Sequence, residues 1–379
     1  MKLTTAGESH GKALVAIIEG LPAHLKIDMD EINRMLALRQ SGFGRGGRQK
    51  IEKDRAEILT GVRNCETLGS PVTLCIYNKD YVNWTDSMSD SVCDENAMAA
   101  KALTKVRPGH ADLTGVVKFV QRDARNILER ASARETAIRV AAGGVYRQYL
   151  SALGVEIGGY VKEVCGVKDG GRYAFTELSK AKTTPVGMLG DEAEKQAEEK
   201  IAALRKSGDT AGGVVEIRIK GLKSGFGSMM TYAEKLDARL AQGLMSIQAI
   251  KGVEVGEGFA VGSTSGKDTH DEIFYDENKG FYRTTNRAGG IEGGMSNGEE
   301  IVLRVAMKPI PTLMKGLQTV DYITKEKTTA ASERSDVCAI FALEIIAESV
   351  VAQVLADVVA ERLGGDTMDE VQKRYALLP

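Results

Sequence analysis

The stretch VCAIFALEIIAESVVAQVLADVVAERL, residues 337–363, is the most apolar part of the 379-residue chain. Glu344, Glu348 and Asp357 interrupt it, which makes it too polar to span a bilayer unaided. Its length and apolar character predict a long buried helix instead. The pair Gly364-Gly365 should end that helix, because glycine favours the C-terminal cap.

Elsewhere in the chain, shorter apolar runs rich in β-branched residues and bounded by glycine or proline predict strands. These runs are 13–19, 72–77, 155–167, 214–219, 253–261 and 301–307. Helical patterns occupy 28–39, 114–129, 133–153, 190–206 and 232–244, the first with Asp28 and Glu31 as a capping box. Strands and helices mix without regular alternation, so we predict an α+β fold rather than a doubly wound sheet.

The composition describes an ordinary globular chain. Hydrophobic residues make up 43% and charged residues 27%, which excludes a disordered or fibrous protein. Lys and Arg total 50 and Asp and Glu total 52, so no overall positive field favours nucleic acid or a membrane surface. Aromatic residues are only 5%, which argues against platforms for stacking nucleic-acid bases.

The five cysteines predict neither a disulfide framework nor a zinc site. None of them forms a Cys-x-x-Cys pair, and their number is odd. The N-terminal residues become polar at once, so no signal peptide can be drawn. We therefore expect a reducing, cytoplasmic setting and no bound metal.

The segment 39–50, RQSGFGRGGRQK, contains four cations and no acid. Glycines let such a loop fold tightly, so that Arg39, Arg45 and Arg48 can converge on one anion. We predict an anion-binding loop. The alternative is a solvated basic loop, in which Lys50 and its neighbours contact only water.

Two of the four histidines lie in glycine-containing turns. His10 lies in the sequence GESHG and His110 in RPGHAD, where Asp112 can orient the imidazole. These settings fit exposed, functional histidines, and the alternative is that both lie in ordinary surface turns. His24 and His270 lack such settings, so we interpret both as structural.

A further anion site is predicted at residues 129–137, ERASARETA. Ser132 and Glu135 have the spacing of a capping box, which places a helix N-terminus beside Arg130 and Arg134. The alternative is an ordinary helix start with surface arginines.

The glycine-rich segment 289–298 should either turn tightly or lie flat against a ligand. The segment KPIPT, 308–312, forms a rigid turn, and Asp336 lies at the start of the long apolar helix. All these motifs together predict a site for a small, multiply anionic substrate.

The motifs resemble, in order and over nearly the whole chain, those of the chorismate synthase family. The resemblance rests on GESHG (7–11), GRGGR (44–48), RPGHAD (107–112), SARETA (132–137), GGI (289–291), SNG (296–298), KPIPT (308–312) and RSD (334–336). Ala131 and Phe43 differ from the serine and tyrosine that are common in the family.

This resemblance implies one domain, residues 1–379, folded as a β-α-β sandwich with helices between two antiparallel sheets, and assembled as a homotetramer. It implies a carbon–oxygen lyase that forms chorismate, in the last common step of aromatic biosynthesis. Phosphate leaves 5-enolpyruvylshikimate 3-phosphate by a trans-1,4-elimination that uses reduced FMN without net redox change. NADPH or an external flavin reductase would supply the reducing equivalents.

The resemblance also implies residue roles. His10 would protonate the leaving phosphate, His110 would stabilise the reduced flavin, and Ser9 and Asp336 would relay a proton. The implied substrate-binding residues are Arg39, Arg45, Arg48, Arg107 and Arg134. The implied FMN contacts are Arg130, Ala131, Ser132, Gln248, Ala249, Gly293, Lys308, Pro309, Ile310, Pro311, Thr312 and Arg334, and Arg39 and Arg45 are associated with NADPH.

Two other functions fit the motifs. A metal-dependent phosphatase would use His10, His110 and Asp112, and a binding module would use the arginine loops only to hold phosphorylated metabolites. Bound flavin or flavin-dependent turnover would separate the first interpretation from both alternatives.

Overall fold

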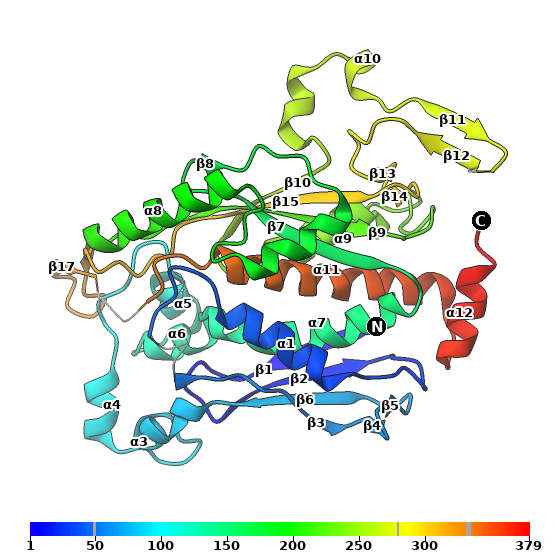
Figure 1. Ribbon diagram of the computed structural model, residues 1–379. Helices are drawn as coiled ribbons and strands as arrows, with labels where there is room; N and C mark the ends of the chain where they lie inside the picture. The colour runs from blue at the N-terminus through cyan, green and yellow to red at the C-terminus, as the bar shows by residue number, and fades with distance from the viewer. Residues whose placement is uncertain (48–50, 279, 331–334) are drawn as a thin grey trace.

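The computed structural model, shown in Figure 1, describes residues 1–47, 51–278, 280–330 and 335–379. Its central element is α11 (Ile340–Leu363), which is buried on every face along most of its length. The predicted start at residue 337 is three residues early. Val337 and Cys338 are not helical because their backbone N–H groups donate to Gly44 O, and Ala211 N donates to Val337 O. The helix ends at Gly364, which adopts a positive φ of 57° as predicted for a terminating glycine.

Two antiparallel sheets form the body of the molecule. The first has the order β1-β2-β6-β3 and the second β10-β15-β9-β7-β8. The strands of the first sheet are β1 (Lys2–Ala6), β2 (Ala13–Glu19), β6 (Val72–Tyr77) and β3 (Glu57–Thr60). Those of the second are β10 (Ile250–Val255), β15 (Ile301–Met307), β9 (Gly213–Lys220), β7 (Glu156–Val164) and β8 (Val167–Lys168). The predicted α+β class, with antiparallel sheets, is confirmed.

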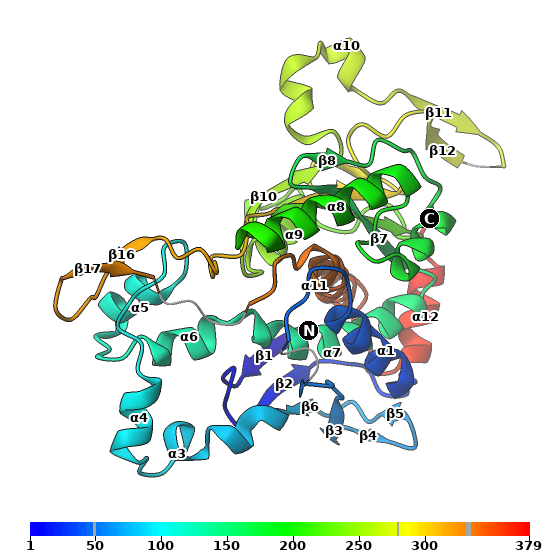
Figure 2. The ribbon, with the colours of Figure 1, turned by 60° about the vertical axis from the view of Figure 1, so that its left-hand side comes forward.

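Three helices pack between these sheets in the views of Figures 1 and 2. They are α1 (Met29–Gln40), α7 (Thr136–Ser151) and α11. Helix α7 contacts β2 and β6 of the first sheet, whereas α11 contacts β7 and β9 of the second, and the two helices pack on each other. Each sheet therefore buries one face against helices, as amphipathic strands require.

The smaller elements lie around this body. The remaining helices are α3 (Thr85–Met88), α4 (Glu95–Lys101), α5 (Asp112–Phe119), α6 (Arg125–Ala131), α8 (Asp191–Ser207), α9 (Leu236–Met245), α10 (Gly266–Thr269) and α12 (Met368–Ala376). Short 3-10 helices are η1 (Lys79–Asn83), η2 (Ala133–Glu135), η3 (Phe175–Thr183), η4 (Tyr232–Glu234) and η5 (Gly258–Ser263). Two-stranded hairpins pair β4 (Val62–Arg63) with β5 (Glu66–Thr67), β11 (Ile273–Asp276) with β12 (Gly280–Arg283), β13 (Ile291–Glu292) with β14 (Met295–Ser296) and β16 (Gln318–Val320) with β17 (Lys327–Thr329).

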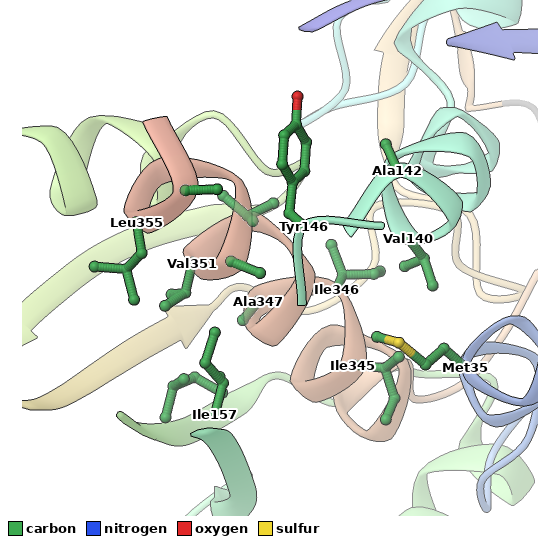
Figure 3. Close-up of a cluster of buried hydrophobic side chains, with 14 of the residues drawn as sticks. Met35, Val140, Ala142, Tyr146, Ile157, Ile345, Ile346, Ala347, Val351 and Leu355 are labelled. Atoms are coloured by element: carbon green, nitrogen blue, oxygen red, sulfur yellow. The ribbon is translucent and has the colours of Figure 1, made fainter. Parts of the chain in front are cut away.

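The main hydrophobic core joins all three layers. Figure 3 shows side chains of α1, α7, β7 and α11 in one cluster, including Met35, Val140, Ala142, Tyr146, Ile157, Ile345, Ile346, Ala347, Val351 and Leu355. The acidic residues of α11 are accommodated by pairing. Lys182 Nζ donates to both Glu344 and Glu348, and Arg147 Nη1 lies 2.5 Å from Glu348 Oε2. A buried carboxylate needs such partners, because an uncompensated buried charge is strongly destabilising.

Several boundaries differ from those predicted, each for a local backbone reason. The single helix at 114–129 is wrong: Val120 adopts a left-handed conformation, and the chain forms α5 and α6 instead. The strand at 253–261 ends at Val255, because Gly256 and Gly258 take positive φ angles and lead into η5. The strand at 155–167 is split by the turn at Cys165 and Gly166, both with positive φ. The helix at 232–244 is divided between η4 and α9, and the helix at 133–153 begins as η2.

In the part of the chain that the structure describes, every helix is too short or too polar to cross a lipid bilayer.

The contact between α7 and α11 depends on a glycine. A Cβ atom at Gly143 would lie 2.3 Å from Ser349 Cβ and 2.7 Å from Ser349 Cα, so the two helices can approach this closely only without a side chain there. We expect Gly143→Ala to lower the free energy of unfolding by about 1–3 kcal/mol through overpacking. Urea denaturation would measure it. Gly262→Ala is the matched control, because nothing lies within 4 Å of its added methyl group. Equal stability of both variants would contradict the close helix contact.

Candidate functional site

A cavity of about 420 Å³ lies beside the first turns of α11. Segments that are far apart in the sequence form its wall: the β1–β2 connection, the end of α1, the junction of α6 and α7, and the chain that follows β15. Most residues predicted from the motifs line it, namely Ser9, His10, Arg39, Arg45, Arg107, His110, Ala131, Ser132, Arg134, Gln248, Ala249, Lys308, Ile310, Pro311, Thr312 and Asp336. The fold therefore brings separate motifs into one site.

The β1–β2 connection places His10 against α6. It turns at Gly7, where φ is +113° and a Cβ atom would lie 2.4 Å from Ala13 O, so only glycine fits. The backbone N of Ser9 donates to Glu129 O at 2.9 Å. His10 Nδ1 lies 2.8 Å from Glu129 Oε1, and His10 N donates to Glu129 Oε2 at 2.7 Å. Because Nδ1 is engaged by the carboxylate, Nε2 is the nitrogen left for a ligand.

The second imidazole is oriented by a local carboxylate. The turn at Gly109, with φ +76°, brings His110 Nδ1 to 2.5 Å from Asp112 Oδ1. Arg107 Nε donates to Asp112 Oδ2 at 2.8 Å, and Arg107 Nη1 donates to Thr312 Oγ1 at 3.1 Å. Burial acts to raise the pKa of the Asp112 carboxyl, but hydrogen bonds from His110 and Arg107 hold that pKa well below its usual range. Asp112 is thus a fixed anion behind His110.

Arg39 and Arg134 share one buried carboxylate. Arg134 Nη1 lies 2.6 Å from Asp54 Oδ1, and Arg39 Nη1 lies 3.6 Å from Asp54 Oδ2. Asn78 Oδ1 accepts from Arg134, and Thr136 Oγ1 accepts from Arg39, so both guanidinium groups are held in place. Burial lowers the pKa of the Arg39 guanidinium to about 9, although the negative charge of Asp54 acts to raise that pKa. The guanidinium keeps its charge at neutral pH, and an anion in the cavity would relieve its desolvation.

Arg45 and Asp336 form a third pair on the wall. Arg45 Nη1 lies 2.9 Å from Asp336 Oδ2, and Gly46 N donates to Asp336 Oδ1 at 2.5 Å. Asp336 lies before Ile340, the first residue of α11, so it does not cap that helix. Arg45 Nε is buried and has no hydrogen-bond partner within the described residues. A buried donor of this kind calls for an acceptor from a ligand or water.

The charges of the wall favour an anion. Among the described residues, five basic side chains line the cavity against two acidic ones: Arg39, Arg45, Arg107, Arg134 and Lys308 against Glu52 and Asp336. Burial, and then the nearby Lys251, lower the pKa of Lys308. The carboxylates of Asp54, Asp112 and Glu129 lie behind the wall and orient its cations and imidazoles.

The cavity also suits a flat, partly apolar cofactor such as a flavin. Its apolar side consists of Leu128, Ile247, Ala249, Met307, Ile310, Pro311, Leu343 and Ile346. Gln248 Oε1 is buried on the same wall and lacks a partner among the described atoms. A flavin ring has apolar faces, and its edge carries N–H donors and carbonyl acceptors. An N–H group could donate to Gln248 Oε1, and a carbonyl could accept from Arg45 Nε.

Comparison with known proteins shows which family this chain belongs to. The sequence model of chorismate synthase matches residues 1–360. The chain belongs to the chorismate synthase family. It is 52% identical to a chorismate synthase of Geobacter sulfurreducens, over 99% of this chain and 97% of that protein. It is 50% identical to one of Alkaliphilus metalliredigens, over 99% and 98%. A crystal structure of a chorismate synthase superposes with a TM-score of 0.78 at 38% identity, covering 99% of this chain and 96% of the other.

A few of the residues suggested by the family resemblance lie off the cavity wall. Arg130 points to the end of β1 and the β1–β2 connection, where it donates to Thr5 O and Gly7 O. Gly293 forms the turn between β13 and β14, away from the residues that line the cavity, and Pro309 also lies off the wall. The glycine-rich segment is thus a tight turn in this chain. Two predicted residues, Arg48 and Arg334, fall outside the described residues, as does Lys50.

Sequence reasoning missed the carboxylates behind the wall. Glu129 holds His10, and Asp54 joins Arg39 to Arg134, yet neither was assigned a role. Glu52 and Asp54 are the first acids after the basic segment 39–50, and their closeness to it was the available signal. The segment 129–137 contained Glu129, but its partner lies in the first turn of the chain.

The predicted trio His10, His110 and Asp112 is not arranged as a metal site. His10 pairs with Glu129, whereas His110 pairs with Asp112. Over residues 1–47, 51–278, 280–330 and 335–379, no three His, Cys, Asp or Glu side chains are grouped as metal ligands. The geometry therefore gives no support to the metal-dependent phosphatase.

The shared carboxylate of Asp54 gives a test of the anion site. Asp54→Asn removes the carboxylate that the two buried guanidinium groups share and leaves Arg134 only the more distant Glu52, 3.8 Å away, so it should lower the free energy of unfolding by about 3–5 kcal/mol in urea. Inorganic phosphate should then raise the Tm of this variant more than that of the wild type, because phosphate replaces the missing anion. Asp191→Asn, an exposed change in α8, is the control. Equal phosphate shifts in wild type and Asp54→Asn would contradict the site.

The lowered pKa of Asp112 predicts a pH dependence. The folded-state pKa lies below the unfolded value of about 4, so the stabilisation by this carboxylate is complete above about pH 5 and is lost as pH falls. Asp112→Asn should therefore be about 3 kcal/mol less stable than the wild type at neutral pH, and the gap should narrow below about pH 5. Urea unfolding at several pH values measures it. Asp369→Asn, an exposed change, should show no such narrowing.

Proposed function

We propose that this chain converts 5-enolpyruvylshikimate 3-phosphate into chorismate by eliminating phosphate, with reduced FMN as cofactor. One observation carries the proposal: two imidazoles, each oriented by its own carboxylate, line a cavity together with five cations. Family membership identifies the reaction class. A binding module would need the cations, but it would have no use for two oriented imidazoles.

The cations would hold the anionic groups of the substrate. Arg39, Arg107 and Arg134 are fixed by carboxylates behind the wall and by hydroxyls on it, so their free donors are already oriented when a ligand arrives. Guanidinium forks suit phosphate and carboxylate oxygens because both can be bound in a bidentate way. Arg45 and Arg48 would complete the set in the loop after α1. Preorganised donors of this kind stabilise the departing phosphate at little reorganisation cost.

His10 would protonate the leaving phosphate through Nε2. Its Nδ1 faces Glu129, which stabilises the charged, doubly protonated ring that a general acid requires. His110 would stabilise negative charge on the cofactor, with Asp112 supporting the imidazolium. Ser9 and Asp336, which both line the cavity, would exchange a proton with the cofactor.

Gln248, Ala249, Ala131, Ser132, Lys308 and the segment 310–312 would hold the flavin, with Pro309 beside them and Arg130, Gly293 and Arg334 as the remaining expected contacts. Reduced FMN, when bound, supplies an electron-rich ring that can lend charge to the allylic system of the substrate and recover it. The chain's own groups bind the substrate, exclude water and move protons. If the chain reduces its own flavin, Arg39 and Arg45 would also bind NADPH. Otherwise an external flavin reductase would reduce the flavin.

Residues 1–379 are proposed to form the single β-α-β sandwich domain of the family. A homotetramer and a cytoplasmic location are proposed with it, as expected for an enzyme of central biosynthesis.

The deciding experiment is chorismate formation under strict exclusion of oxygen. Full-length protein with substrate and chemically reduced FMN should give many turnovers without net flavin oxidation. Oxidised FMN without a reductant should bind but give no product. Consumption of one reduced flavin per chorismate would contradict the redox-neutral reaction, and absence of product in every condition would contradict the function.

The two imidazoles give the mutational test. His10→Ala and His110→Ala should each lower kcat by about 10²–10⁴-fold, the usual contribution of a positioned acid or base. Flavin binding should persist in both variants. His24→Ala and His270→Ala are matched controls, because both histidines are exposed and lie off the cavity wall. A His10 or His110 variant with normal kcat at saturating substrate would remove that residue from the mechanism.

A further inference from the structure

The only tryptophan of the chain stacks on the imidazole that we propose as general acid. The ring centroids of His10 and Trp84 are 4.0 Å apart, with 25° between the planes. Trp84 lies between η1 and α3, in the segment that follows β6, whereas His10 lies in the β1–β2 connection. Trp84 does not itself line the cavity. Any effect of the indole on the reaction must therefore pass through His10.

The far side of the indole is covered by a cation. Lys101 Nζ lies 4.1 Å from the centroid of the Trp84 ring. Two groups cannot both lie about 4 Å above the same face, so Lys101 and His10 occupy opposite faces. Trp84 Nε1 donates to Asp80 Oδ2 at 3.1 Å, which fixes the rotation of the indole about its own axis. The indole is thus held between η1, α4 and the imidazole.

Arg125 connects this stack to the carboxylate that binds His10. Its guanidinium carbon lies 5.4 Å from the Trp84 ring centroid, and its Nη1 lies 3.7 Å from Glu129 Oε1. Arg125 Nε also donates to Lys101 O at 3.0 Å, so it ties α6 to α4. The same residue therefore restrains both groups that touch the His10 ring.

His10 is constrained in two independent directions. Glu129, which is almost completely buried, fixes the in-plane direction of the ring through Nδ1. Trp84 fixes the plane of the ring by covering one face. The electron-rich face of an indole attracts a cation, so the stack also favours the protonated ring. This matters because the five cations on the cavity wall act against a further positive charge.

We propose that Trp84 is a positioning residue for His10: it sets the plane of the imidazole and stabilises the imidazolium that donates a proton to the leaving phosphate. The proposal rests on the general-acid role of His10 proposed above. An aliphatic side chain could fill the same space beside η1, but it would provide neither a flat face nor attraction to a cation.

The kinetic test uses two substitutions of Trp84. Trp84→Leu keeps bulk but removes the aromatic face, and Trp84→Phe keeps a face. With reduced FMN, Trp84→Leu should lower kcat about 10- to 100-fold, the usual cost of a misplaced catalytic group, while KM for the substrate and flavin affinity change less than about 2-fold. Trp84→Phe should recover most of kcat. Tyr81→Leu, which removes another ring from η1, is the matched control and should leave kcat nearly unchanged.

A double-mutant cycle separates this inference from the proposed function. In a His10→Ala background, Trp84→Leu should cost nothing more, because Trp84 acts only through His10. If His10→Ala leaves kcat normal, the proposed role of His10 fails. If His10→Ala lowers kcat but Trp84→Leu does not, or if the two losses multiply, the role of Trp84 fails while that of His10 stands.

A spectroscopic test needs no change at Trp84 and so remains valid if Trp84→Leu does not fold. All indole emission comes from Trp84, because the chain has one tryptophan. A protonated imidazole in contact with an indole quenches its fluorescence by electron transfer. In the full chain before flavin is added, at pH 6, His10→Gln should therefore increase the emission, whereas His24→Gln should not. Unchanged emission in His10→Gln would show that the stack does not form and would overturn the proposal.

Discussion

The structure depends on the need to cover α11 on every side. A 24-residue helix without a polar face cannot lie on a surface, so other elements must surround it. Helices α1 and α7 cover one side and strands β7 and β9 another. This requirement also positions the site, because Ala339, Ala342, Leu343 and Ile346 at the beginning of α11 form part of the cavity wall. The same apolar surface thus serves the core and the apolar side of the cavity.

Charge balance is the second constraint on the site. Five cations and imidazoles of the wall have a carboxylate behind them: Asp54 lies behind Arg39 and Arg134, Asp112 behind Arg107 and His110, and Glu129 behind His10. These carboxylates allow the basic side chains to stay charged in a partly buried position. Because they lie away from the ligand space, they orient donors without repelling an anion. The cavity can therefore attract a multiply charged substrate and still belong to a stable fold.

The sequence predicted what depends on local patterns. The long buried helix, the strands 13–19, 72–77 and 301–307, and the cap at Asp28 follow from apolar runs and capping residues that act over a few positions. The division of 114–129 into two helices was missed because it depends on one non-glycine residue, Val120, in a left-handed conformation. Propensity gives no warning of that conformation, because it is uncommon for any residue except glycine and rarest for a β-branched residue such as Val120.

The candidate site shows the same difference between local and long-range interactions. Glycine-flanked histidines and arginines predicted the side chains of a ligand site, and most of them line the cavity. A carboxylate partner could not be predicted from the sequence when it lay far along the chain from the side chain that it holds. Asp112 was recognised because it lies two residues from His110, whereas Glu129 lies 119 positions from His10 and could be paired with it only after folding.

Because the two histidines differ in their sequence distance from their carboxylates, the geometries of the two imidazoles depend on different parts of the fold. The pair of His110 and Asp112 is built within one turn, so it can form wherever that turn forms. His10 is held by Glu129 of α6 and by Trp84 between η1 and α3, so its geometry exists only when the β1–β2 connection, the η1–α3 segment and α6 are packed together. The backbone bonds from Ser9 and His10 to Glu129 strengthen that packing, since they fix the turn itself to α6. The imidazole proposed as proton donor is therefore assembled by tertiary structure, whereas the imidazole proposed to support the cofactor is assembled locally. Any motion that separates α6 from the β1–β2 connection will disorganise the first before it affects the second.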